Sequence, residues 1–228
     1  MEAFSRWFSQ LQWGRLIEMA LSATACLFCI VVHELCHGLA ALCLGDDTAR
    51  RNGRLTLNPL KHIDLVGLVL LITAGFGWAK PVCVDMRKFR RPKLGMAVTA
   101  LAGPASNGLL AFLLTPVYAA AFVWYQISGH LFAYYLAVFL LTAISVSIGL
   151  MVFNLIPIPP LDGSKVLFSV LPPRAYLLLM RYERYGMILL VALLYLGILD
   201  TPLSALRSGI RQFIFTAAGD PVVRLLIG

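Results

Sequence analysis

The sequence predicts an α-helical polytopic membrane protein with about four transmembrane helices. Hydrophobic residues make up 60% of its 228 positions, and the mean hydropathy is +0.82. Only 13% of the residues are charged, against about 25% in soluble globular domains. Residues 94–161, a stretch of 68, contain no Asp, Glu, Lys or Arg. This length suits a single domain made of the helices and their connections.

The first apolar segment covers residues 19–44 and carries the sequence H-E-x-x-H at His33, Glu34 and His37. On a helix the two imidazoles lie one turn apart on the same face, so they can converge on one cation. The carboxylate between them is close enough to take a proton. A charged residue at the centre of a membrane helix costs roughly 2.5–3.5 kcal/mol, and a bound divalent cation would offset this cost. The alternative is that each histidine only hydrogen-bonds a neighbouring helix.

Residues 45–93 form a basic module, with ten Lys or Arg against four Asp. Asn52-Gly53 is a hairpin signal, and residues 54–57 alternate as in a short strand. The apolar run at 63–79 has basic residues on both sides. If this run crossed the membrane, one basic cluster would have to be translocated, which the positive-inside bias disfavours. We therefore expect a small cytoplasmic-side module with β structure and a re-entrant segment. The basic residues flank apolar segments, which favours orientation in a bilayer over nucleic-acid binding.

The elements after residue 93 are predicted from the lengths of the apolar stretches and from the positions of the prolines. Two transmembrane helices are predicted at residues 94–125 and 131–153, and the polar break between them carries no Lys or Arg. Three prolines within residues 154–163 end the second of these helices and give an extended segment that turns at an Asp-Gly pair. A fourth helix is predicted at 173–199. The tail, residues 203–228, has arginines spaced among apolar residues and is typical of an amphipathic interfacial helix.

A catalytic zinc site needs three protein ligands and an open position for water, so the histidine pair requires a third ligand. The candidates are His62, Asp64, His130 and Asp162. If the first helix runs inward, the histidine pair lies at about the level of Asp162, whereas His130 is most of a bilayer away. A rigid proline-rich turn also fixes a carboxylate well. An Asp-Gly pair is equally an ordinary turn, so Asp162 taken alone remains open.

Taken together, four motifs resemble the site-2 protease family of intramembrane zinc metalloproteases, in its compact bacterial branch. They are the H-E-x-x-H sequence, N-x-x-P-x-x-x-x-D-G at 154–163, A-G-P-x-x-N at 102–107, and G-D-D-T with G-R-L-T-L-N-P within 45–59. The likeness covers roughly residues 19–165. It implies a three-helix catalytic core, a zinc ion near the cytosolic face and cleavage of a substrate's transmembrane segment. It also implies strands in the module after the first core helix, one of which pairs with the unwound substrate.

By this resemblance His33, His37 and Asp162 match the metal ligands, and Glu34 matches the general base. One Zn²⁺ at these ligands would activate water and polarise the scissile carbonyl, and Glu34 would pass the proton to the leaving amine. The amides of Asn107 and Asn154 could donate hydrogen bonds to a developing oxyanion, although bonds between helices explain them equally well.

The sequence therefore predicts a multi-pass protein of the plasma membrane that hydrolyses transmembrane protein substrates, with its active site toward the cytoplasm. The alternative function is a metal-ion transporter, which also places His and Glu in membrane helices. A transporter needs a polar path through the bilayer, and residues 94–125 and 131–153 supply very few polar side chains.

Overall fold

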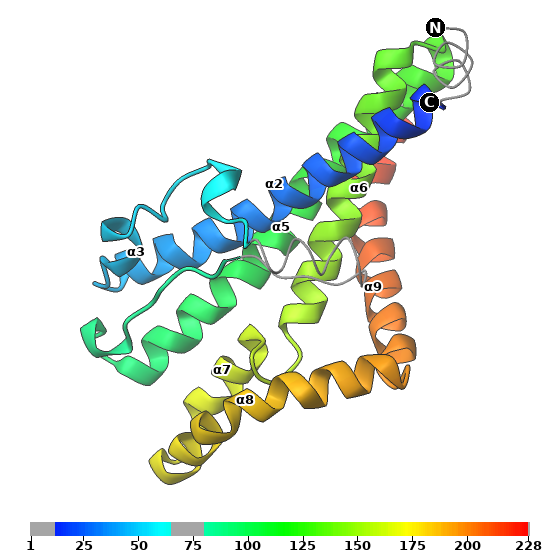
Figure 1. Cartoon of the computed structure of the whole chain (residues 1–228). Coiled ribbons are helices and arrows are strands. Elements are labelled where there is room, and N and C mark those ends of the chain that lie inside the picture. The colour runs from blue at the N-terminus through cyan, green and yellow to red at the C-terminus, as the bar shows by residue number, and fades with distance from the viewer. Residues whose placement is uncertain (1–11, 65–79, 228) are drawn as a thin grey trace, which may run out of the picture.

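Three long helices form the core of the computed structural model, which describes residues 12–64 and 80–227. Within this part, α2 (Trp13–Cys43), α5 (Pro92–Ser128) and α6 (Leu131–Asn154) are long and apolar enough to cross a membrane. Each packs against the other two, and Figure 1 shows α2 running beside α5 and α6. A helix satisfies its own backbone hydrogen bonds, as apolar segments in a bilayer require.

The three helices occupy the predicted positions but extend beyond the apolar runs. α2 begins at Trp13 rather than at residue 19, and the added turns include Glu18. The Glu18 carboxylate accepts a hydrogen bond of 2.6 Å from the Tyr134 hydroxyl at the start of α6. Polar residues at a membrane surface can continue a helix, so hydropathy alone places its ends too far inward.

Small side chains bring α2 and α6 close together. Ala25 and Cys29 of α2 and Ala143 of α6 are fully buried in one cluster. The Cys29 thiol donates to the Ala143 carbonyl over 3.3 Å and accepts a bond from the Ser147 hydroxyl. Small residues allow the close backbone approach that drives helix association in lipid.

The basic module contains α3 (Thr48–Arg51) and two short 3₁₀ turns, η1 (Pro59–Lys61) and η2 (Met86–Lys88). The predicted strand at residues 54–57 does not form, because residues 55–57 are bends, and the β structure predicted for the module as a whole stays a prediction. Thr56 and Asn58 instead use their side chains to bind nearby backbone amides, which competes with strand pairing. Of the re-entrant segment predicted at 63–79, residues 65–79 lie outside the described residues.

The chain after α6 makes a tight turn and then a helix that the sequence analysis did not predict. Asp162 and Gly163 open α7 (Asp162–Val170) rather than forming an isolated turn. A Cβ atom on Gly163 would lie 2.7 Å from the carbonyl oxygen of Ile156, so only glycine permits this approach. α7 packs against α5, and the Lys93 ammonium donates to the Leu171 carbonyl at the end of α7 over 2.6 Å.

The C-terminal region contains α8 (Pro173–Tyr195), α9 (Asp200–Ile214), the π-helical turn η3 (Phe215–Gly219) and α10 (Asp220–Ile227). Residues 185–195 and 200–227 meet at 84°, so a fourth span over 173–199 remains a prediction. The tail, predicted as an interfacial helix, is helical but packs lengthwise against α5 and α6 (Figure 1). Its Ile214 is buried with apolar residues of both helices: Ala111, Ile144, Ile148 and Val152.

Candidate metal centre

The inner face of α2 presents His33 and His37 one turn apart, as the H-E-x-x-H spacing predicts. Their side chains are buried, with 5% of His33 and 8% of His37 exposed. The two rings stand almost at right angles, at 89°, with centroids 4.5 Å apart. This arrangement directs the Nε2 atoms of both rings toward one point, 3.0 Å from each other.

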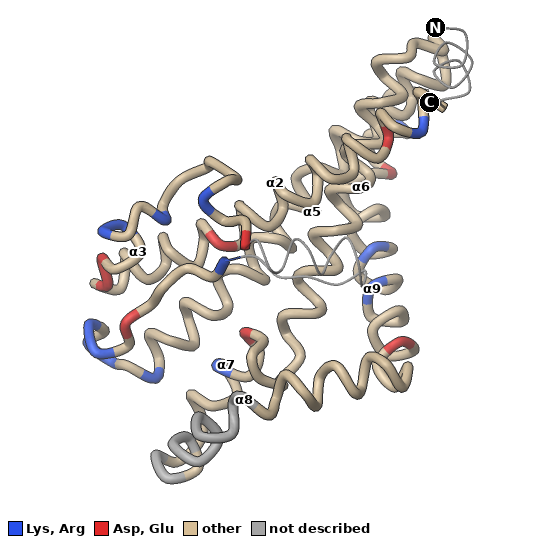
Figure 2. Tube along the Cα trace, viewed as in Figure 1, with Lys and Arg blue, Asp and Glu red and all other residues tan. Residues whose placement is uncertain are grey.

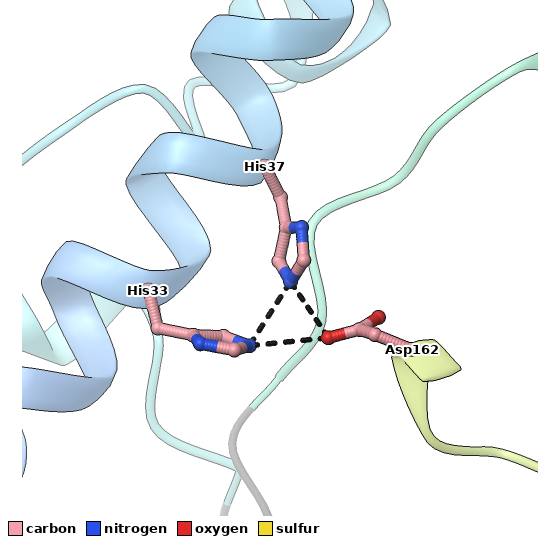
Figure 3. A group of neighbouring side chains, drawn as sticks. All are labelled: His33, His37 and Asp162. Carbon is pink, nitrogen blue, oxygen red and sulfur yellow. Dashed lines mark hydrogen bonds and ion pairs between the residues drawn. The ribbon is translucent and has the colours of Figure 1, made fainter. Parts of the chain in front are cut away.

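Asp162 approaches the same point from the first turn of α7 (Figure 3). Its Oδ2 atom lies 3.3 Å from Nε2 of His33 and 3.0 Å from Nε2 of His37. The carboxylate is also buried, at 7% exposure. The structure thus brings together residues from opposite ends of the predicted core, more than 120 positions apart in the sequence.

The spacing of these three atoms fits a zinc ion. Ligands at about 2.0–2.1 Å from a tetrahedral ion lie about 3.3 Å from one another. The three donor atoms observed are 3.0–3.3 Å apart. Two imidazoles and a carboxylate are also a donor set that catalytic zinc sites use. His33, His37 and Asp162 could therefore hold this metal.

Neighbouring groups fix the orientation of two of the three side chains. Nδ1 of His37 donates to the Thr99 carbonyl of α5 over 2.7 Å, which leaves Nε2 of that ring unprotonated for a metal. The Lys165 ammonium lies 3.2 Å from Oδ1 of Asp162, the oxygen that faces away from the histidines. The buried Nδ1 of His33 has no hydrogen-bond partner among the described residues.

The Asp162 carboxyl is held in its charged form. Burial opposes that charge, but with His37 protonated on both nitrogens, as it is before a metal binds, hydrogen bonds from His33 and His37 and the charges of His37 and Lys165 outweigh it. Together they hold the pKa of Asp162 well below its ordinary value. A metal ligand must be deprotonated, so this carboxylate is ready to bind a cation.

Gly103 of α5 makes room for the two imidazoles. A Cβ atom built at this position would lie 2.6 Å from Cε1 of His33 and would also overlap the His37 ring. Only glycine leaves the space that the rings occupy. Gly103 lies in the A-G-P-x-x-N motif at 102–107, but that motif alone predicts no contact with the metal centre.

Glu34 lies beside the cluster and contacts a different part of the chain. Its Oε2 atom accepts a hydrogen bond of 3.0 Å from the backbone N–H of Val82. Val82 belongs to residues 80–85, which lack helix and strand and follow the undescribed part of the basic module. The side chain of Val82 also lies close to Gly38 on α2, the residue after His37.

The two asparagines differ in their surroundings. Asn107 is fully buried one helical turn beyond Gly103, and neither its nitrogen nor its oxygen has a hydrogen-bond partner among the described residues. Asn154 donates to the Leu150 carbonyl of its own helix over 3.0 Å. Among the described residues, neither amide makes a hydrogen bond to the histidine pair or to Asp162, so their roles stay predictions.

The other candidate third ligands lie elsewhere. His62 is buried in the basic module, with Nε2 2.9 Å from the Thr56 carbonyl. His130 caps the start of α6 and stacks on Trp124 at the far end of the bundle. Among the described residues, neither His62, Asp64 nor His130 joins the group that could hold a metal.

Sequence reasoning missed Thr99, Val82 and Lys165 as neighbours of the site. Thr99 and Val82 act through backbone atoms, so their side chains give no signal. Lys165 follows Asp162 by three positions, the spacing at which side chains on a helix meet. If a helix had been predicted at α7, this spacing would have indicated the contact.

Comparisons of the sequence with known proteins give independent information on its family. Residues 123–197 match the model of peptidase family M50, a range that includes Asp162 but not the histidine pair. Two similar bacterial proteins share the name "Putative zinc metalloprotease", YwhC of Bacillus subtilis (strain 168) and Rip2 of Mycolicibacterium smegmatis.

The likeness extends well beyond the range of the family model. The chain is 39% identical to YwhC over 162 residues, which are 71% of this chain and 74% of YwhC. It is 31% identical to Rip2 over 210 residues, which are 85% of this chain and 76% of Rip2. No solved structure was found to match.

Proposed function

The chain belongs to peptidase family M50, the site-2 proteases, and from this premise we propose that it carries out regulated intramembrane proteolysis. It is a zinc metalloendopeptidase of the membrane. Its substrates in this proposal are membrane proteins that are cut in or near a transmembrane segment. The single observation that supports the proposal best is the meeting of His33, His37 and Asp162 inside a bundle of apolar helices.

His33, His37 and Asp162 hold one zinc ion in this proposal. The burial of all three side chains and the distances among their donor atoms support the assignment. When bound, zinc supplies Lewis acidity that activates water and polarises a carbonyl group. Thr99 holds the His37 ring in the tautomer that offers Nε2, and Lys165 binds the Asp162 oxygen that faces away from the histidines.

Glu34 is the general base. Its place between the two histidines puts the carboxylate within reach of water at the metal centre. It takes a proton from that water and later gives it to the leaving amine. The hydrogen bond from the Val82 N–H orients the carboxylate.

Asn107 is the better placed of the two proposed oxyanion donors. Its buried amide has no partner among the described residues, and an amide of this kind is costly to leave unsatisfied. A substrate carbonyl that gains negative charge would supply the missing acceptor. Asn154 already donates to its own helix, so its amide is less available as a second oxyanion donor.

The substrate must unwind before it reaches the metal centre, because a helix hides its peptide bonds. We assign residues 80–85 as the segment beside which the unwound chain lies, since Val82 is in contact with Glu34. Pairing with this segment would satisfy the exposed substrate backbone.

Replacing Val84 with proline tests this pairing, because proline removes a backbone donor and leaves the metal ligands unchanged. We expect cleavage to fall by about tenfold while the zinc content stays that of the natural protein. A Val84→Leu variant, which keeps the N–H, is the control. Full activity of the proline variant would contradict the pairing.

The active site faces the cytoplasm of a plasma-membrane protein in this proposal. Figure 2 shows Lys and Arg of the basic module gathered where α2 ends and α5 begins. His37 is six residues before the end of α2, or about 9 Å along the helix axis. The metal centre therefore lies toward the basic end, which the positive-inside bias assigns to the cytoplasmic side.

Glu34→Gln tests the proposed function. We expect the variant, reconstituted with a transmembrane substrate, to keep its zinc and to lose cleavage by about 10²–10⁴-fold. Glu18→Gln removes the same charge at the opposite end of α2 and should cleave as the natural protein does. Zinc flux across the vesicle membrane without any cleavage would instead favour a transporter and overturn the proposal.

A further inference from the structure

A cavity of about 530 Å³ lies between the end of α2 and the start of α5. Its wall includes Leu44, Leu94 and Val98, and two arginines, Arg90 and Arg91, line it as well. Leu94 and Val98 are 54% and 42% exposed, so the apolar wall opens to the outside of the bundle. None of the residues that line it belongs to the metal centre.

The arginines of this cavity lack a counter-charge. In the described part of the chain, neither Arg90 nor Arg91 makes an ion pair or a side-chain hydrogen bond. The acidic groups nearby are already occupied by other basic residues. Asp85 pairs with Arg87 at 3.0 Å, and Asp47 pairs with Lys88 at 2.7 Å.

The cavity therefore combines two free guanidinium groups with an apolar wall at one end of a membrane helix bundle. Guanidinium groups bind phosphate oxygens in pairs, with a geometry that suits a phosphodiester. The apolar wall suits the first part of an acyl chain. Membrane leaflets rich in anionic lipids attract basic groups at this depth. The volume lies in the usual range of about 300–1,000 Å³ for small-ligand sites.

We propose that this cavity binds an anionic phospholipid, with its phosphate on Arg90 and Arg91 and one acyl chain along Leu44, Leu94 and Val98. The lipid bridges the end of α2 and the start of α5. Asp46, just after α2, already holds the residues before η2 in place by accepting a bond of 2.6 Å from the Asp85 N–H, and the lipid would add a link from α2 to α5. Bound lipid should therefore raise the thermal stability of the protein, and it does so independently of the proteolytic function.

Lipid retention by the purified full-length protein tests this proposal. The protein in a neutral detergent is mixed with phosphatidylglycerol or phosphatidylcholine, and bound lipid is counted by native mass spectrometry. We expect phosphatidylglycerol to be retained by the natural protein and phosphatidylcholine to be lost. Arg90→Gln with Arg91→Gln should weaken retention by at least about tenfold.

Two further variants separate a built site from general attraction. Arg50→Gln with Lys61→Gln removes the same charge from the same basic module outside the cavity, and should retain the lipid. Val98→Phe fills the cavity without a change of charge, and should lose it. The zinc content of each variant reports that the fold is intact.

Three outcomes would overturn the proposal. Equal loss in both charge variants would show that only net charge matters. Equal retention of phosphatidylcholine would show that the arginines are not used. Displacement of phosphatidylglycerol by inorganic phosphate, with no effect of Val98→Phe, would show a site for a free anion rather than for a lipid.

Discussion

At the scale of single residues, the metal centre depends on positions where α5 approaches α2. Thr99 offers its carbonyl to His37, and Gly103 leaves the space that both rings fill. The two residues are four positions apart, so they lie on one face of α5. One face of α5 thus fixes the tautomer of a histidine and the separation of the pair.

Gly103→Ala should weaken the metal centre while leaving the helix intact. The new methyl group would overlap both imidazoles, whereas alanine favours the helix by about 1 kcal/mol over glycine. We expect zinc affinity, measured by competition with a chelator, to fall by about 10–100-fold. Gly149→Ala on α6 is the control, because a Cβ atom there has no neighbour within 4 Å. Unchanged zinc affinity in Gly103→Ala would refute the steric role.

Sequence reasoning proposed His33, Glu34 and His37 from a short motif with a chemical meaning, and Asp162 from a resemblance to a known family. The structure brings His33, His37 and Asp162 together, and the roles of all four residues stay predictions. Sequence reasoning did not reach Gly103, Thr99 or Val82 as parts of the site. Their contacts depend on how α5 and residues 80–85 lie against α2, and that packing is not written in any local pattern. A polar side chain in an apolar helix gives a signal in the sequence. The lack of a side chain at Gly103 and the backbone carbonyl of Thr99 give none.

At the scale of elements, a buried carboxylate ties the end of α2 to the start of η2. Asp46 is fully buried, accepts bonds from Thr48 and from the Asp85 N–H, and lies 3.4 Å from the Lys88 ammonium. This network fixes the approach of residues 80–85 to the metal centre.

The stability of the protein should fall in acid partly because of Asp46. Burial opposes its charge, but hydrogen bonds from Thr48, the Asp85 N–H and Lys88 outweigh it, so the pKa of Asp46 is lowered. A lowered pKa gives stability that is present above the unfolded value of about 3.9 and is lost as the pH falls toward the folded value.

Thermal unfolding at a series of pH values measures this contribution. Asp46→Asn should unfold at a lower temperature than the natural protein at pH 7, and the difference should shrink as the pH falls below about 4. Asp47→Asn, which removes a partly exposed carboxylate, should change stability less. A difference for Asp46→Asn that does not vary with pH would contradict this account.

The elements themselves could be predicted to different extents. Residues 94–153 contain no Lys, Arg, Asp or Glu, and their two helices were found at the predicted positions. α7 was missed because the prolines before it pointed to an extended chain. The tail was expected to lie on the membrane surface because its arginines recur among apolar residues, but burial of Ile214 depends on the matching surface of α5 and α6.

At the scale of the whole molecule, apolar helices carry a small polar centre close to their basic end. Figure 2 shows basic residues at the ends of α2 and α5 nearest that centre, whereas the middle of the bundle is almost free of charge. A water-dependent reaction needs access to solvent, and a site near one membrane surface provides it at little cost to the apolar core. This arrangement supports the proposal that hydrolysis takes place at the edge of the hydrocarbon layer.

The most direct test of the metal centre is X-ray absorption at the zinc edge, combined with zinc content, on the natural protein and on Asp162→Ala. The natural protein should hold one zinc ion with two imidazole nitrogens and a carboxylate oxygen in its shell. Asp162→Ala should bind zinc at least about tenfold more weakly or lose that oxygen, and an Asp200→Ala control should do neither. An Asp162→Ala protein with full zinc affinity and an unchanged shell would contradict the assignment.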